Sequence, residues 1–229
     1  VPNQRPTARY HFNVGTEPRD EYQKEMIRYL SAQGEYRNMM LASQQVLSLP
    51  TRSGKTYCTI AATGLLESRA IVIVNRDTLR KQWVDEIIMH TQLSPKNVIS
   101  IDSSEFFSGY GDLNRLARKL KNVYIFVTTH RTIHNAMKLY GFDCVDKLLK
   151  ALNVGIKIVD EAHIECKNTL MTDYATNVWK TIYLTATFAR SDDKENQFLQ
   201  RSFNQVLKVA KQNQEREKTV GLCMVEFSQ

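Results

Sequence analysis

The sequence lacks any apolar run that approaches the roughly 18 consecutive residues needed to span a membrane. Only 9 of its 229 residues are glycine, which excludes a collagen-like repeat. A hydrophobic fraction of 42% beside 24% charged residues excludes a disordered chain. No internal repeat and no low-complexity block is present. The composition is therefore that of a globular protein, long enough for one large domain with additions.

Cysteine is also scarce, and its spacing excludes two further classes. The four residues are Cys58, Cys144, Cys166 and Cys223. Their long and irregular intervals fit neither a paired zinc-ligand pattern nor the disulfide framework of a small secreted protein. We expect reduced thiols that mostly fill the core. Residues 1–20 contain no apolar segment of the kind found in a secretory signal, so we expect a fragment of a longer, intracellular protein with no membrane partner.

Acidic residues are outnumbered, with 24 Asp and Glu against 31 Lys and Arg, giving a net charge of +7. This excess favours a polyanionic partner such as nucleic acid. The segment from Asp112 to Lys150 alone supplies +5 of it. The basic residues of this segment are Arg115, Arg118, Lys119, Lys121, Arg131, Lys138, Lys147 and Lys150, and its acids are Asp112, Asp143 and Asp146.

Short runs rich in β-branched residues alternate with segments of helical periodicity. The runs are too apolar for half-exposed strands, which indicates a buried parallel sheet with crossover helices. The predicted strands are residues 46–49, 70–74, 98–101, 124–128, 155–159 and 181–184. The predicted helices are residues 21–30, 57–66, 78–89, 113–120 and 145–152. This order predicts an α/β fold, a doubly wound parallel sheet with helices on both faces.

The character of the sequence changes after Ala189, because residues 190–218 are rich in charged and amide side chains. We expect a linker with one helix, and then a strand that starts at residues 220–227. The weak apolar stripe of that helix is Phe198, Leu199, Phe203, Val206 and Leu207.

The strongest local signal is the segment Leu49-Pro50-Thr51-Arg52-Ser53-Gly54-Lys55-Thr56, which follows a predicted strand and opens a predicted helix. That context is typical of a phosphate-binding loop, in which backbone N–H groups and the helix dipole face the phosphates. Lys55 would reach the β- and γ-phosphates of ATP, and the Thr56 hydroxyl would ligate Mg²⁺. Leu49 stands where the general pattern has glycine, so only the Gly-Lys-Thr part matches.

Two carboxylates, Asp160 and Glu161, follow directly after the predicted strand 155–159. In a parallel sheet the carboxyl ends of the strands share one edge, so this pair should face the phosphate loop. Asp160 suits the role of a Mg²⁺ ligand. Glu161 can orient and deprotonate an attacking water. The sequence therefore predicts a site for ATP hydrolysis, with Lys55, Asp160 and Glu161 as its catalytic residues.

Several segments in this order resemble the motifs of superfamily 2 helicases, most closely the RecG, XPB and phage UvsW type of DNA motor. Residues 50–56 resemble motif I, 72–83 motif Ia, and 127–130 the motif that follows it. Residues 160–163 spell the DEAH form of motif II, and residues 184–187 match motif III. The resemblance implies a RecA-like domain, a P-loop NTPase, over residues 19–190. Residues 1–18 would then form an N-terminal extension, and residues 191–229 a tail towards a second RecA-like domain.

The resemblance also implies roles for residues at matching positions. Gln23 and Tyr22 would contact adenine, and Thr51, Arg52, Ser53 and Gly54 would hold phosphate. His163, Thr185 and Thr187 would couple the nucleotide to the nucleic-acid face. Arg76, Thr128 and Thr129 would lie along a phosphate backbone, where such donors bind without reading sequence. Arg52 and Asn75 depart from the family, which often has glycine and proline there. Trp83 can be a core residue or can stack on a base, and helical placement favours the core.

A superfamily 2 motor needs a second RecA-like lobe, which supplies arginine fingers to the nucleotide. We expect this chain to hold the first lobe alone and to be nearly inactive in hydrolysis without the second. Three functions stay open. The chain can belong to an ATP-dependent DNA helicase or annealing motor, to a duplex translocase of the restriction or remodelling type, or to a nucleotide-gated binding module that does not hydrolyse ATP. The resemblance favours DNA over RNA.

Overall fold

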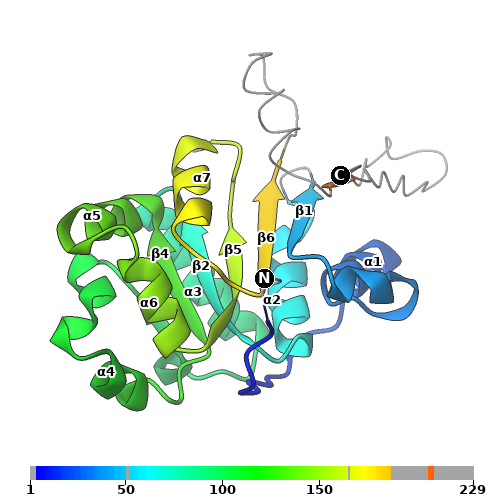
Figure 1. The fold of residues 1–229 in the computed structure, drawn as a ribbon. Coiled ribbons are helices and arrows are strands. Elements are labelled where there is room, and N and C mark those ends of the chain that lie inside the picture. The colour runs from blue at the N-terminus through cyan, green and yellow to red at the C-terminus, as the bar shows by residue number, and fades with distance from the viewer. Residues whose placement is uncertain (1–3, 50–51, 165, 187–205, 209–229) are drawn as a thin grey trace.

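The computed structural model describes residues 4–49, 52–164, 166–186 and 206–208, and these form a three-layer α/β fold (Figure 1). Seven strands make one sheet in the order β3-β4-β2-β5-β6-β1-β7, and every pairing between neighbours is parallel. The strands are β1 (Gln44–Ser48), β2 (Arg69–Val74), β3 (Val98–Ser100), β4 (Ile125–Thr129), β5 (Val154–Val159), β6 (Lys180–Thr185) and β7 (Val206–Lys208). The predicted doubly wound, RecA-like architecture is confirmed.

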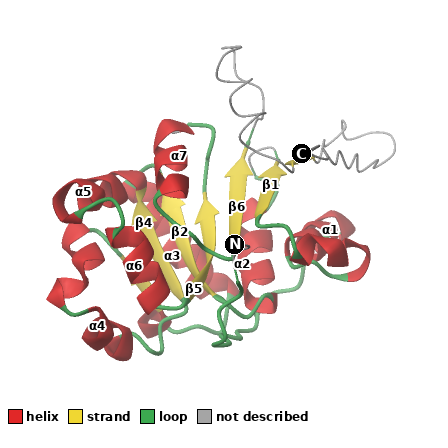
Figure 2. Ribbon diagram, in the orientation of Figure 1, coloured by secondary structure: helices red, strands yellow, loops and turns green. Residues whose placement is uncertain are grey.

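Helices cover both faces of the sheet (Figure 2). One face carries α1 (Glu21–Leu30), α2 (Lys55–Leu65) and α3 (Asp77–His90), and the other carries α4 (Leu113–Lys119), α5 (His130–Tyr140), α6 (Cys144–Ala151) and α7 (Cys166–Tyr174). The 3₁₀ segments are η1 (Gly34–Met40), η2 (Pro95–Asn97) and η3 (Ser104–Gly111).

Burial on both faces explains the near-continuous apolar runs of the strands. All six residues of β2, β5 and β6 are buried. Within β2, Val72 packs towards the α1–α3 side and Ile73 towards the α5–α6 side, as the alternation of a strand requires. Cys58 and Cys144 are free thiols buried in these two cores, as expected. No helix in the described part of the chain is long and apolar enough to cross a membrane.

Two helices and one strand depart from the expectations. α5 begins at His130 with no loop after β4, because Thr129 itself accepts a hydrogen bond from the Thr132 backbone as the N-cap. α7 escaped prediction because it has almost no apolar stripe, and its innermost residues include Thr169 and Thr172.

The predicted helix in the tail was wrong at Val206 and Leu207, which belong to β7 beside β1. The rest of that stripe and the expected strand at 220–227 lie outside the described residues.

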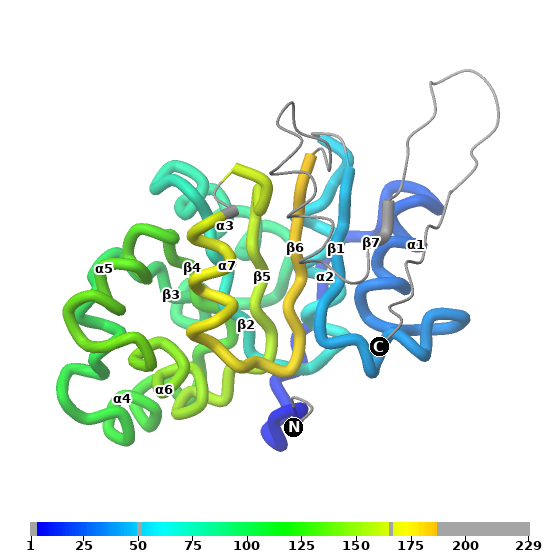
Figure 3. Tube along the Cα trace, turned by 45° about the horizontal axis from the view of Figure 1, so that its top comes forward, coloured from blue at the N-terminus to red at the C-terminus, as the bar shows by residue number. Residues whose placement is uncertain are grey.

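Residues 4–18, expected to form an extension, pack against the domain, and the start of this segment lies below the sheet (Figure 3). The Phe12 side chain is only 6% exposed. The Tyr10 backbone N–H donates to the Glu67 carbonyl, and that of Gly15 to the His90 carbonyl. The Tyr10 ring also lies 4.1 Å from the buried Arg69 guanidinium. This segment therefore contributes to the hydrophobic core.

Candidate functional site

The phosphate loop turns sharply between β1 and α2, at the carboxyl edge of the sheet. Gly54 has φ of 90° and directly precedes α2, and Arg52 has φ of 65°. Glycine reaches this left-handed region without a steric penalty, so Arg52 adopts a conformation that glycine would adopt more easily. Ser53 is 2% exposed, and its Oγ atom has no hydrogen-bond partner. Thr51 lies outside the described residues.

Lys55 is held between the loop and the acidic pair. Its Nζ atom donates to the Leu49 carbonyl at 3.1 Å and lies 3.8 Å from Glu161 Oε1. The side chain is 9% exposed. The structure therefore brings Lys55 and Glu161 together, as the sequence predicted, although 106 positions separate them in the numbering of the chain.

Gln23 packs directly over the phosphate loop. A Cβ atom at Gly54 would lie 2.2 Å from the Gln23 Nε2 atom. The Oε1 atom of Gln23 accepts a hydrogen bond from the Arg19 backbone at 2.8 Å, and Asp20 caps α1 by accepting from the Gln23 backbone. A side chain at position 54 would therefore displace the Gln23 amide and also strain the backbone.

Tyr22, the other expected adenine contact, does not line the cavity beside the loop. It packs partly buried against the core, and its hydroxyl has no hydrogen-bond partner. Burial, followed by the charge of Asp20, raises the pKa of Tyr22 to about 12.

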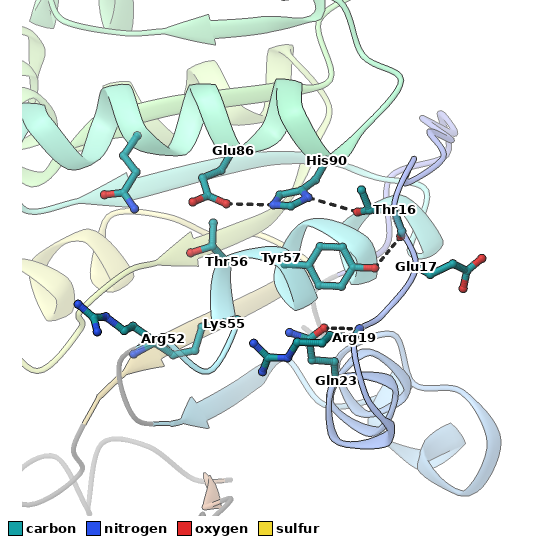
Figure 4. Close-up of a pocket in the computed structure, with 12 residues that line it drawn as sticks. Thr16, Glu17, Arg19, Gln23, Arg52, Lys55, Thr56, Tyr57, Glu86 and His90 are labelled. Atoms are coloured by element: carbon teal, nitrogen blue, oxygen red, sulfur yellow. Dashed lines mark hydrogen bonds and ion pairs between the residues drawn. The ribbon is translucent and has the colours of Figure 1, made fainter.

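A cavity of about 500 Å³ opens beside the loop, between α1, α2 and α3 (Figure 4). Its lining includes five of the predicted nucleotide-binding residues, namely Gln23, Arg52, Gly54, Lys55 and Thr56. It also includes residues that sequence reasoning missed, namely Thr16, Glu17, Arg19, Tyr57, Gln82, Glu86 and His90.

Four of the missed residues form a connected wall of the cavity. His90 lies 3.2 Å from Glu86 through Nε2 and 3.2 Å from the Thr16 hydroxyl through Nδ1. The Tyr57 hydroxyl donates to the Thr16 carbonyl at 2.8 Å, and its ring meets His90 edge to face. These residues come from three distant parts of the chain, so no local pattern could have grouped them.

Asp160 is 9% exposed at the end of β5, and both of its carboxylate oxygens are engaged. Oδ2 accepts from the Trp83 indole at 2.8 Å, and Oδ1 accepts from the Glu161 backbone at 3.0 Å. The pKa of Asp160 is raised, mainly by burial. The hydrogen bond from Trp83 and the charge of Lys55 oppose this shift, and the charge of Glu161 adds to it. Trp83 is 2% exposed, so the core interpretation is confirmed and base stacking is excluded.

The two expected coupling residues that the structure describes are in contact. His163 Nδ1 lies 2.9 Å from the Thr185 hydroxyl and 3.3 Å from Glu161 Oε2. Thr185 ends β6, and Glu161 has φ of 48°. The segment after β5 therefore bends back on the end of β6. Thr187 lies outside the described residues.

The three expected nucleic-acid contacts differ in exposure. Arg76 is exposed at the start of α3. Thr128 is fully buried and its hydroxyl donates to the Ile101 carbonyl. Thr129 is 5% exposed and its hydroxyl caps α5. Of the three side chains, only Arg76 is free to meet a phosphate without rearrangement.

The basic residues of the segment from Asp112 to Lys150 do not gather at one edge of the sheet, and Arg131 is the one that follows Thr129 most closely in the chain. Arg69, at the start of β2, binds the carbonyls of Leu120 and Lys121, which places the end of α4 at the amino edge of the sheet. Thr128 and Thr129 lie at the opposite, carboxyl edge. Further along the segment, two lysines form ion pairs with its own acids, Lys147 with Asp143 and Lys150 with Asp146.

Among the described residues, no group of three or more His, Cys, Asp or Glu side chains could hold a metal ion. Mg²⁺ differs from metals bound in all-protein cages, because it usually keeps waters and takes one or two carboxylates plus phosphate oxygens. A site made from Thr56 and Asp160 fits that chemistry.

Comparisons with known proteins agree with this geometry. The family model described as type III restriction enzyme, res subunit, matches residues 17–190. The chain is similar to the general transcription and DNA repair factor IIH helicase/translocase subunit XPB of Enterocytozoon bieneusi (strain H348). The two are 27% identical over 157 residues, which is 67% of this chain and 25% of that protein.

Three solved structures share the fold. The Hef helicase domain of Pyrococcus furiosus is 16% identical with a TM-score of 0.54, over 81% of this chain and 37% of that one. The UvsW helicase of bacteriophage T4 is 18% identical with a TM-score of 0.53, over 84% and 60%. A nuclease-deletion mutant of the type ISP restriction-modification enzyme LlaGI, in complex with a DNA substrate mimic, is 13% identical with a TM-score of 0.55, over 82% and 21%. The chain thus spans only part of each relative.

Proposed function

Since the chain belongs to the type III restriction enzyme, res subunit family of superfamily 2 helicases and translocases, we propose that it is the N-terminal ATP-binding lobe of a DNA motor. The motor would be a helicase or an annealing and branch-migrating enzyme that acts inside the cell, where its DNA track lies. ATP would be its substrate and Mg²⁺ its cofactor. A second RecA-like domain of the full-length protein would complete it.

The observation that carries the proposal is the approach of Lys55 Nζ to within 3.8 Å of Glu161 Oε1, beside the phosphate loop. Lys55 would bind the β- and γ-phosphates and offset their charge. Glu161 would orient the attacking water and accept its proton. A protein that only switches on nucleotide binding has no need of a carboxylate at that point.

The residues around the loop fit ATP. The cavity of about 500 Å³ lies within the range of roughly 300–1,000 Å³ that is typical of small-molecule sites. The buried Ser53 Oγ atom has no hydrogen-bond partner, which a phosphate oxygen would supply. Gln23 would contact adenine from its place above Gly54, and Arg52 with Thr51 would complete the phosphate cradle.

Thr56 and Asp160 would hold Mg²⁺, which would neutralise negative charge on the phosphates. The wall of Glu86 and His90 closes the cavity on the α3 side.

The contact between His163 and Thr185 supports a coupling role for the DEAH segment. A shift of Glu161 would be passed through His163 to the end of β6 and on to Thr187. Arg76 would meet the phosphate backbone of the nucleic acid, with Thr128 and Thr129 beside it at the carboxyl end of β4. Without arginine fingers from a second lobe, worth about 10³ to 10⁵ in rate, the lobe alone should bind ATP weakly and hydrolyse it slowly.

The runner-up is a duplex DNA translocase that never separates strands. The name of the matched family and the fold shared with a type ISP restriction enzyme favour it. A non-hydrolysing, nucleotide-gated binding module is a third candidate, which the placement of Glu161 beside Lys55 disfavours.

The test is ATP hydrolysis by the full-length protein with single-stranded, duplex and branched DNA and with RNA, followed by assays for strand separation and for triplex displacement. Stimulation by branched or single-stranded DNA with strand separation or annealing supports the proposal. Stimulation by duplex DNA with triplex displacement but no strand separation establishes the translocase instead. ATP binding without turnover on any nucleic acid would leave only the binding module.

A further inference from the structure

Trp83 and Asp160 are joined by a buried hydrogen bond although 77 positions separate them in the chain. The Trp83 indole N–H, from the middle of α3, donates to Asp160 Oδ2 at 2.8 Å. The exposed fractions of the two side chains are 2% and 9%. Water is thus nearly excluded from the bond, and a hydrogen bond to a buried carboxylate is stronger than one between neutral groups.

The bond fixes the plane of the Asp160 carboxylate. Oδ2 accepts from Trp83 and Oδ1 accepts from the Glu161 backbone, so each oxygen is held by a donor on a different element. A carboxylate has about four lone-pair positions, so both oxygens keep one for a cation or its waters. The indole N–H is a donor only and carries no titratable proton, so its role does not change with protonation.

A packing role alone does not account for this arrangement. Trp83 shares its core with Ile87, one turn further along α3, which fills space without any polar atom. A buried indole needs some acceptor for its N–H. Here that acceptor is the carboxylate which the proposed function assigns to Mg²⁺.

We propose that Trp83 is a positioning residue for the Asp160 carboxylate and sets the affinity of the site for Mg²⁺. This inference rests on the proposed function. When a group that hydrogen-bonds to a metal ligand without touching the metal is replaced, the metal affinity typically falls by about 10- to 100-fold. Trp83 also lies about two helical turns from Arg76, at the start of the same helix, so a DNA contact at Arg76 and the metal ligand share one rigid element.

The experiment compares Trp83→Phe with Trp179→Phe in the full-length enzyme. Phenylalanine keeps an aromatic ring in the core but removes the N–H. Trp179 is the only other tryptophan among these 229 residues, is 8% exposed, and packs against Arg5 and Lys180, away from the described site residues. It therefore controls for the loss of a buried indole.

In Trp83→Phe, the Mg²⁺ concentration that gives half-maximal ATP hydrolysis should rise about tenfold or more, with kcat at saturating Mg²⁺ falling less. Trp179→Phe should leave that concentration unchanged. If Trp83→Phe loses stability in urea but keeps the Mg²⁺ dependence of the wild type, Trp83 is structural only and the inference is wrong. If the wild-type enzyme does not hydrolyse ATP at all, the proposed function fails first.

A second readout holds even if Trp83→Phe does not fold. With Trp179 and any tryptophan outside these 229 residues replaced by Phe, Trp83 is the sole tryptophan, so its fluorescence reports on the Asp160 carboxylate. Addition of Mg²⁺ with ATP should change this emission, and Asp160→Asn in the same background should abolish the Mg²⁺-dependent part. An emission that Mg²⁺ leaves unchanged, with ATP bound, would overturn the inference.

Discussion

Replacing Gly54 by alanine should weaken ATP binding through a clash that can be traced to one atom. The new Cβ would lie 2.2 Å from Gln23 Nε2, far inside van der Waals contact. The Gln23 side chain would have to move away from the loop, which would break the hydrogen bond that its Oε1 atom accepts from the Arg19 backbone. That bond is worth about 1 kcal/mol. The φ of 90° at Gly54 adds about 1–2 kcal/mol for any residue with a Cβ.

The matched control is Gly111→Ala. Gly111 has a similar φ of 82°, but nothing lies within 4 Å of an added Cβ. In Gly111→Ala, backbone strain alone should lower the free energy of unfolding by about 1–2 kcal/mol, and the ATP affinity should not change. Gly54→Ala should lose about 2–3 kcal/mol of unfolding free energy. The loss of about 1 kcal/mol at Gln23 should lower the ATP affinity about fivefold, since 1.4 kcal/mol corresponds to a factor of ten.

Urea unfolding measures the stability of both variants, and titration with a fluorescent ATP analogue measures the affinity. Equal ATP affinity in Gly54→Ala and Gly111→Ala would refute the reasoning, because the contact between Gln23 and the loop would then have no part in nucleotide binding.

Two further predictions concern stability. Phe12→Ala should lower the free energy of unfolding by about 3–5 kcal/mol, because a nearly fully buried ring is removed, and a loss below about 1 kcal/mol in urea unfolding would show that residues 4–18 do not belong to the core. Burial lowers the pKa of Lys180 from 10.5 to about 8, so between these values the unfolded state binds a proton that the folded state does not, and stability should rise with pH. Urea unfolding between pH 7.5 and 9.5 should show this rise in the wild type and a flatter profile in Lys180→Met; parallel profiles would contradict it.

The sequence was informative wherever the chemistry is local. The Gly-Lys-Thr helix start and the carboxylates after β5 are contiguous signals. Because the carboxyl ends of parallel strands share one edge of the sheet, these signals were enough to place Lys55 opposite Glu161. The core placement of Trp83 followed from its helical stripe. Its bond to Asp160 did not, because a hydrogen bond between two elements leaves no trace in the spacing along either one.

Other features depended on tertiary packing. The packing of Phe12 and the wall made by Thr16, Tyr57 and His90 join distant segments. The charge of the segment from Asp112 to Lys150 could not be placed from the sequence, because its residues run from one edge of the sheet to the other and net charge along the chain is not charge on one surface. α5 was not predicted, although Ile133 and Met137 stand at helical spacing, because no turn signal separates the helix from the strand before it.

The most direct test of the central claim is single-turnover ATP hydrolysis by the full-length protein carrying Glu161→Gln, beside the wild type and with DNA present. Glutamine keeps the size of the side chain but cannot accept the proton of the attacking water. We expect Glu161→Gln to bind ATP with an affinity within about threefold of the wild type and to hydrolyse it about 10²- to 10⁴-fold more slowly. A variant that hydrolyses ATP at the wild-type rate would contradict it.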